Sequence, residues 1–112
     1  MIKRGDMGPG THAVLNEADR LGIPTPQEER ALVVRCEAGD RDAINELAIR
    51  HSKMIVPLIH KYVSDNTSAD DAFQAGFLGL IRAAEKSNVE RWDKQYNKMM
   101  SDWSSKVGPS PF

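Results

Sequence analysis

The side chains best suited to catalysis or metal binding are few in this chain, and their spacing does not suit either role. The three histidines, His12, His51 and His60, form no zinc pattern, and the last two point to opposite sides of the helix expected to carry them. Asp70 and Asp71 have no clustered histidine or glutamate at metal-ligand spacing. No nucleophile is paired with a base either. We therefore expect no enzyme, no metal and no cofactor.

The composition sets broad limits on function. The 112 residues suit one domain, and 15 basic against 16 acidic side chains give a net charge of -1. A protein that binds nucleic acid on its own is usually plainly basic. Cys36 is the only cysteine, and its apolar neighbours predict a small buried thiol in a reducing compartment. Residues 1–10 lack a signal-peptide core, and no run reaches the roughly 18 apolar residues of a membrane span, so we expect a soluble intracellular protein.

One stretch places an unexpected leucine among polar residues. Residues 70–86 read D-D-A-F-Q-A-G-F-L-G-L-I-R-A-A-E-K and wind as a helix with two interior glycines. One side is a core face, where Gly76 permits close helix approach, whereas the pattern gives no reason for Gly79. The opposite side carries Asp71, Gln74, Ala75, Leu78, Arg82 and Glu85. Leu78 is either an ordinary exposed leucine or part of a surface that docks a helical partner.

Helix start and stop signals divide the rest of the chain. Residues 1–10 predict a flexible arm, 11–107 one helical domain, and 108–112 an irregular tail. Thr11 is expected to cap a helix that Gly22 ends, and Thr25 to cap the next through a capping box with Glu28. Asp40 caps a long helix to residue 63, with a kink or break at Pro57. Helices are also expected from residue 67 or 68 to 87 and over 89–107. No segment alternates as a strand, so the predicted fold is an all-α, compact multi-helix bundle.

The 70–86 stretch and its upstream neighbours resemble bacterial sigma factor region two. Residues 71–86 resemble the signature D-L-I-Q-E-G-N-I-G-L-[IM]-[RK]-A-V-E-K. T-P-Q-E-E-R-A-L at 25–32, A-G-D-R-D-A-I-N-E-L at 38–47 and H-S-K-M-I-V-P-L-I-H-K-Y-V at 51–63 resemble the segments that precede it. The likeness covers roughly residues 13–91, in one register apart from a slightly shortened loop after Val63.

The resemblance implies a partner and a docking surface. In that family this helix and the one before it bind the clamp coiled coil of the largest subunit of RNA polymerase. The implied polymerase-binding residues are Asp71, Gln74, Ala75, Phe77, Leu78, Ile81 and Arg82, with Arg50 and Lys53 framing the site. Ala75 replaces the usual glutamate, which pairs with clamp arginines, and Phe77 replaces the usual asparagine. An aromatic side chain at an interface offers an anchor in return.

The resemblance stops after Arg91. The family continues with aromatic residues that help to melt promoter DNA, but this chain reads W-D-K-Q-Y-N-K-M-M-S-D-W-S-S-K-V at 92–107. The residues left as candidates for DNA contact are Arg91, Lys94, Tyr96, Lys98 and Trp103. The alternative is a packing or oligomer interface along the helical stripe formed by Trp92, Tyr96, Met99 and Trp103. Nothing resembles the helix-turn-helix that reads upstream promoter DNA.

Three hypotheses of function follow. The first is a sigma-like transcription factor that binds core RNA polymerase, either competing with the host sigma factor or acting as a partial, specialised sigma factor. Promoter DNA would then be a partner only within that complex. The second is a helical structural or assembly protein that has lost the polymerase contact, and the third is a direct DNA binder, which the near-neutral charge disfavours. A compact sigma-like chain also suggests a phage or mobile element, hence the cytoplasm of a bacterium or of an infected host.

Overall fold

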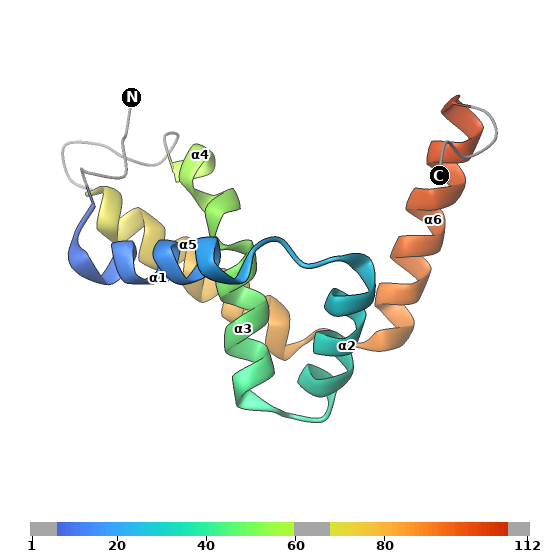
Figure 1. Ribbon diagram of the computed structural model, residues 1–112, viewed down its shortest axis with the longest axis horizontal. Helices are drawn as coiled ribbons and strands as arrows, with labels where there is room; N and C mark the ends of the chain where they lie inside the picture. The colour runs from blue at the N-terminus through green and yellow to red at the C-terminus, as the bar shows by residue number, and fades with distance from the viewer. Residues whose placement is uncertain (1–6, 60–67, 108–112) are drawn as a thin grey trace.

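The computed structural model describes residues 7–59 and 68–107, with side chains as far as Asp102. Every regular element in these residues is helical, which confirms the all-α prediction (Figure 1). The elements in order are α1 (Pro9–Leu21), α2 (Pro26–Glu37), α3 (Arg41–His51), the 3-10 helix η2 (Ser52–Met54), α4 (Ile55–Ile59), α5 (Ala69–Glu85) and α6 (Val89–Val107). No described helix has the length and apolarity needed to cross a bilayer.

Local capping fixes where most helices begin. Thr25 and Glu28 form the predicted capping box, each side chain accepting the other's backbone N–H at 3.1 Å. Asp40 caps α3 by accepting from the N–H groups of Asp42 and Ala43. Ser68 caps α5 by accepting from the Asp71 N–H at 3.1 Å. These three predicted helix starts are therefore confirmed. They were readable from sequence because each cap involves only residues within one turn.

The predicted long helix after Asp40 is broken before Pro57 instead of at it. α3 ends at His51, η2 occupies Ser52–Met54, and α4 restarts at Ile55. The break places Pro57 third in a new helix, where no backbone N–H is needed. A continuous helix would press the proline ring against the carbonyl of Lys53. The remainder of the predicted helix, residues 60–63, lies outside the described residues.

The N-terminal end of the domain differs from the prediction. α1 begins at Pro9 with Gly8 as its N-cap, so Thr11 lies inside the helix and does not cap it. Met7 is buried in the core. α1 therefore begins two residues before the boundary predicted at residue 11, and Met7 packs in the core ahead of it. Residues 1–6 and the predicted tail at 108–112 lie outside the described residues.

Two hydrophobic clusters form the core, and α5 runs through both. The first cluster joins α2 and α3 to the C-terminal end of α5, where Ala84 is buried, and includes the buried thiol of Cys36. The second joins α1 and α4 to the N-terminal half of α5, where Ala72 and Phe73 are buried. Because α5 packs in both clusters, its rotation about its own axis is fixed, and so is the side of the helix that faces solvent.

α6 leaves the body formed by the other helices. Its first turns lie against α2, and its C-terminal turns stand away from the rest of the molecule (Figure 1). Val89 and Trp92 pack on the first hydrophobic cluster. Met99, farther along the same stripe, remains 54% exposed. The predicted helix at 89–107 is therefore present, but only its beginning is anchored in the core.

Candidate protein-docking face

A stripe of α5 faces solvent, and we call it the docking face. It consists of Asp71, Gln74, Ala75, Leu78 and Arg82, all exposed. Steps of three and four residues place them on one side of a helix. Leu78 is 49% exposed in the middle of this polar stripe. The arrangement offers an exposed acid near the N-terminal end, an amide and an apolar side chain along the centre, and a cation toward the C-terminal end.

Two of the predicted contact residues lie at the rim of the core and not on the docking face. Phe77 is half-buried, packs on the second hydrophobic cluster and stacks on Phe73 with ring centroids 6.2 Å apart. Ile81 is half-buried against the first cluster. Each side chain presents only part of its surface. The replacement of asparagine by Phe77 therefore extends the core as well as the exposed face.

The sequence predicted that Arg50 frames the docking face, and this prediction is wrong because the side chain is turned into the fold. Its side chain is only 7% exposed and sits between α3, the α1–α2 connection and the start of α2. The guanidinium donates to the Gly22 carbonyl at 3.0 Å and to the carboxylates of Glu46 and Glu28 at 3.1 and 3.2 Å. Arg50 is thus a structural residue, because its donors are used in joining three segments.

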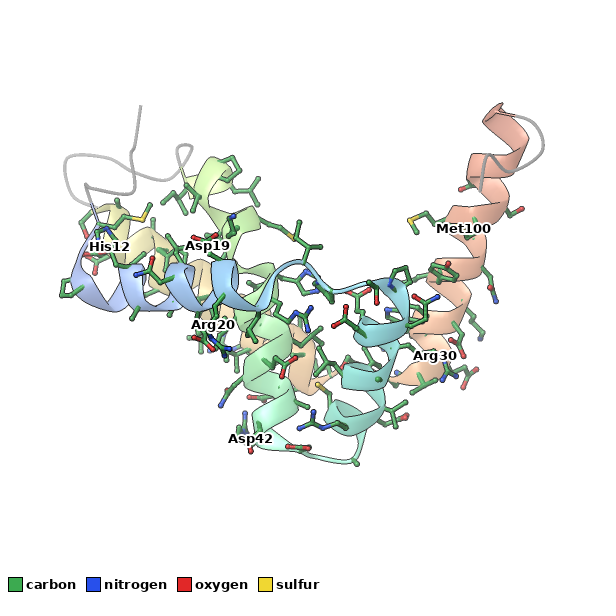
Figure 2. The ribbon with its side chains drawn as sticks, in the orientation of Figure 1. His12, Asp19, Arg20, Arg30, Asp42 and Met100 are labelled. Carbon is green, nitrogen blue, oxygen red and sulfur yellow. The ribbon has the colours of Figure 1, made fainter. Side chains whose placement is uncertain are left out.

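The two other cations predicted near the polymerase site, Lys53 and Arg82, differ in whether they form an ion pair. The Lys53 ammonium lies 2.7 Å from a carboxylate oxygen of Asp19, on α1 (Asp19 is labelled in Figure 2). Arg82 is exposed and has no ion pair with any described residue. Of the two cations, Arg82 is therefore the one available to an incoming partner.

Sequence reasoning missed a carboxylate that holds α1 against α5. Asp70 lies in the first turn of α5, and its carboxylate accepts from the Gly8 N–H at 2.7 and 2.9 Å and from the Thr11 hydroxyl at 2.9 Å. Gly8 provides no side-chain cap, so Asp70 caps α1 from another helix. A Cβ at Gly8 would lie 2.6 Å from Asp70 Oδ2, which explains the glycine. The only sequence signal was an acid beside a helix start.

Sequence reasoning also missed an apolar groove between α4 and α5, which we call the α4–α5 groove. Its volume is about 650 Å³. One bank is formed by η2 and α4 and the other by α5, with lining residues Met54, Ile55, Leu58, Ile59, Asp71, Ala72, Ala75, Gly76, Gly79 and Leu80. Asp71 is the only charged residue among the described residues that line it. The signal in the sequence was the second interior glycine, Gly79, for which core packing gave no reason.

Two aromatic residues of α6, Trp92 and Tyr96, make contacts within the described part of the molecule. The Trp92 indole N–H donates to one carboxylate oxygen of Glu29 at 3.0 Å, and the other oxygen lies 2.8 Å from His51 Nε2. Trp92 also stacks on Tyr96, with ring centroids 5.1 Å apart and planes 8° from parallel. Two residues predicted for an oligomer or DNA interface thus meet in the same stack. The side chain of Trp103 lies outside the described residues.

An ion pair fixes the direction of α6. Arg30 of α2, labelled in Figure 2, donates to both carboxylate oxygens of Asp93, at 2.8 and 3.0 Å. The guanidinium lowers the pKa of that carboxyl below its usual range. Such a bidentate pair restricts orientation as well as distance. Together with the Glu29–Trp92 bond it sets the angle at which α6 leaves α2.

Cations without a partner gather in one part of the described chain. Most described arginines and lysines form ion pairs, among them Lys94 with Glu90 at 3.1 Å. The described cations that form none are Arg82, Lys86, Arg91 and Lys98, from the end of α5 into α6. Arg91 and Lys98 are seven residues apart and share one side of α6. Arg91 and Lys98 are therefore two cations on one side of α6 that form no ion pair with a described residue, in a chain whose net charge is -1.

Comparison with known proteins finds similar sequences among sigma factors. Residues 47–94 match the model for sigma-70 region 2. The RNA polymerase sigma factor SigA of Listeria monocytogenes and that of Listeria innocua are each 38% identical over 77 residues, 69% of this chain and 21% of theirs. SigA of Clostridium acetobutylicum is 34% identical over 77 residues, 20% of its length. The chain thus spans about a fifth of the length of these curated relatives. No solved structure matches it significantly. These matches support a sigma-70 region 2 domain in this chain, with residues 47–94 matching the family model, in agreement with the resemblance that its own sequence indicated.

Proposed function

We propose that this protein is a sigma-like transcription factor that binds core RNA polymerase through the docking face of α5. The observation that carries the proposal is the exposure of Asp71, Gln74, Ala75, Leu78 and Arg82 in one stripe. The resemblance to region two implies contact with the clamp coiled coil at these positions. Asp71 and Arg82 supply polar pairing at the two ends, and Leu78 supplies apolar area at the centre. Phe77 and Ile81 are half-buried beside the docking face, and their exposed atoms add apolar area to it.

The physical basis of this docking is an apolar centre bordered by charges. A half-exposed leucine that becomes buried in an interface contributes favourable free energy in proportion to the apolar area removed from water. Charges at the border set orientation and association rate more than affinity. We therefore expect Leu78 to dominate the affinity, and Asp71 and Arg82 to dominate its salt dependence.

The test is a binding measurement with purified Listeria monocytogenes core RNA polymerase, whose sigma factor is among the relatives, and with its isolated clamp coiled coil. Leu78→Asp should weaken binding at least tenfold, because it places a charge in the apolar centre. Val34→Asp is the matched control, since Val34 is a similarly exposed apolar residue (44%) on α2. Lys53→Ala should also leave binding unchanged. No binding of the unmodified protein at micromolar concentration refutes the proposal and favours the helical assembly protein.

The unpaired cations at the start of α6 support a second proposal, contact with promoter DNA inside the polymerase complex. Lys86, Arg91 and Lys98 form no ion pair with a described residue and can neutralise phosphates, whereas Lys94 is paired with Glu90. A fork-junction promoter probe, tested with and without polymerase, separates the two modes of action. Retention of the probe only in the ternary complex identifies a partial sigma factor. Displacement of SigA without probe retention identifies a competitor.

A further inference from the structure

The α4–α5 groove continues directly from the docking face. Asp71 and Ala75 belong to both surfaces, because they lie at the edge of the exposed stripe and also line the groove. A helix seated on the docking face therefore also meets the mouth of the groove. On the far bank, Met54 and Leu58 are exposed by 57% and 52%. A single partner helix can thus cover Leu78 on one side of Ala75 and these two side chains on the other.

The lining defines the chemistry of the group that enters. Among the described residues, every lining residue except Asp71 is apolar or a glycine, and Asp71 lies in the first turn of α5. A charged side chain inside the groove would lose its hydration and gain no partner beyond that rim. An apolar side chain would be transferred from water into an apolar recess, which is favourable. The groove therefore suits an apolar residue with a basic neighbour able to reach Asp71.

We propose that the α4–α5 groove receives an apolar side chain from the docked polymerase helix, and that this contact replaces the charge pair normally made by a glutamate at the position of Ala75. The inference rests on the proposed polymerase docking and specifies how this chain achieves it. A glutamate at Ala75 would extend across the mouth of the groove. The alanine removes the charge pair and, because it is small, leaves the mouth of the groove open to an apolar side chain.

Gly79 supports this assignment because no described residue requires a glycine at this position. A Cβ at Gly79 would meet no atom within 4 Å, whereas a Cβ at Gly76 would lie 2.8 Å from Ile55 Cγ2. Gly76 is thus needed for the packing of α5 on α4. Gly79 only weakens its helix relative to alanine. Because Gly79 has no side chain, it leaves space in the groove that a larger residue on α5 would occupy.

Two substitutions test the groove contact, and for one of them, Ala75→Glu, the groove contact and the usual charge pairing predict opposite results. Gly79→Met fills the groove without disturbing the core, and should weaken binding to Listeria monocytogenes core RNA polymerase by about ten- to hundredfold. Ala75→Glu restores the family residue and should also weaken binding, by about tenfold or more, because it closes the groove mouth. Under the usual charge pairing, Ala75→Glu would instead strengthen binding. Ala31→Met, on the exposed side of α2, is the control for an added surface methionine.

The outcomes separate this inference from the docking proposal. Circular dichroism and thermal unfolding should show Gly79→Met at least as stable as the unmodified protein, which excludes misfolding as a cause of lost binding. If Leu78→Asp weakens binding while Gly79→Met and Ala75→Glu bind normally, the docking face stands and the groove contact is refuted. Tighter binding by Ala75→Glu refutes it as well. If Leu78→Asp binds normally, or the unmodified protein does not bind, both proposals fail.

Discussion

The two interior glycines of α5 provide a matched test of the packing between α4 and α5. Gly76 and Gly79 lie in the same helix, three residues apart, and face different surroundings. A Cβ at Gly76 would lie 2.8 Å from Cγ2 of Ile55 and 3.5 Å from its Cδ1 and Cγ1. Ile55 is only 6% exposed, and its β-branched side chain has little rotamer freedom. A Cβ at Gly79 would reach open space. We therefore predict that alanine has opposite effects at the two positions.

The magnitude follows from two opposing terms. Alanine in a helix interior is more stable than glycine by about 0.5–1 kcal/mol, and this term is the same at both sites. Only Gly76→Ala adds an overpacking cost, typically about 1–3 kcal/mol in a well-packed core. Gly79→Ala should therefore stabilise the protein by about 0.5–1 kcal/mol. The difference between the two variants should be about 1–3 kcal/mol, which isolates the contact with Ile55.

Urea unfolding followed by circular dichroism measures both variants against the unmodified protein. Equal slopes would show that the unfolded states are comparable, so that the midpoints report stability. Ile55→Leu removes the γ2 methyl at constant volume, and should recover part of the loss in the Gly76→Ala background. Equal stability of Gly76→Ala and Gly79→Ala would refute the close packing of α4 on α5, and with it the shape of the groove.

Three further predictions concern single polar side chains. Arg50→Met should lower the free energy of unfolding by about 2 kcal/mol, because the Gly22 carbonyl loses its charged donor, and chemical denaturation would measure this. Asp70→Ala should cost about 1–2 kcal/mol and speed hydrogen exchange at the start of α1 but not in α2, because Asp70 caps only α1. For Asp40, the Arg35 guanidinium, followed by the Ala43 N–H, lowers the pKa below the usual 3.8. Its charge therefore stabilises the fold above about that pH and ceases to do so as the pH falls through the lower folded value. Asp40→Asn should be less stable than the unmodified protein at pH 6 and equally stable in strong acid. If the difference in free energy of unfolding between the two proteins is the same at both pH values, the role of the charge is contradicted.

The parts of the fold that sequence predicts well are those decided within one turn of chain. Thr25, Asp40 and Ser68 cap helices through hydrogen bonds to residues two or three positions ahead. Such short-range interactions are readable from residue type and spacing. Pro57 illustrates the limit, because its effect on the helix was predicted but the place of the break was not. The break depends on where the chain can form a 3-10 turn and still restart a helix before the proline.

The parts that sequence could not predict depend on distant residues. Asp70 meets Gly8 across 62 positions and Arg50 meets Gly22 across 28. Residue type alone does not distinguish an acid that caps its own helix from one that caps a neighbour. For the docking face, the family resemblance indicated the helix and its side, whereas burial separated the exposed residues from Phe77 and Ile81. The α4–α5 groove required the positions of both helices.

The engagement of the α6 aromatics has a consequence for any contact with unpaired bases. A base can stack on the face of Tyr96 that Trp92 covers only if the pair separates, and Trp92 is held by its bond to Glu29 as well as by stacking. DNA binding there would therefore compete with the contacts that anchor α6 to α2. Phosphate contacts by Arg91 and Lys98 require no such opening, because neither cation has an internal partner in the described residues. DNA contact by this chain should consequently depend on salt more than on base identity.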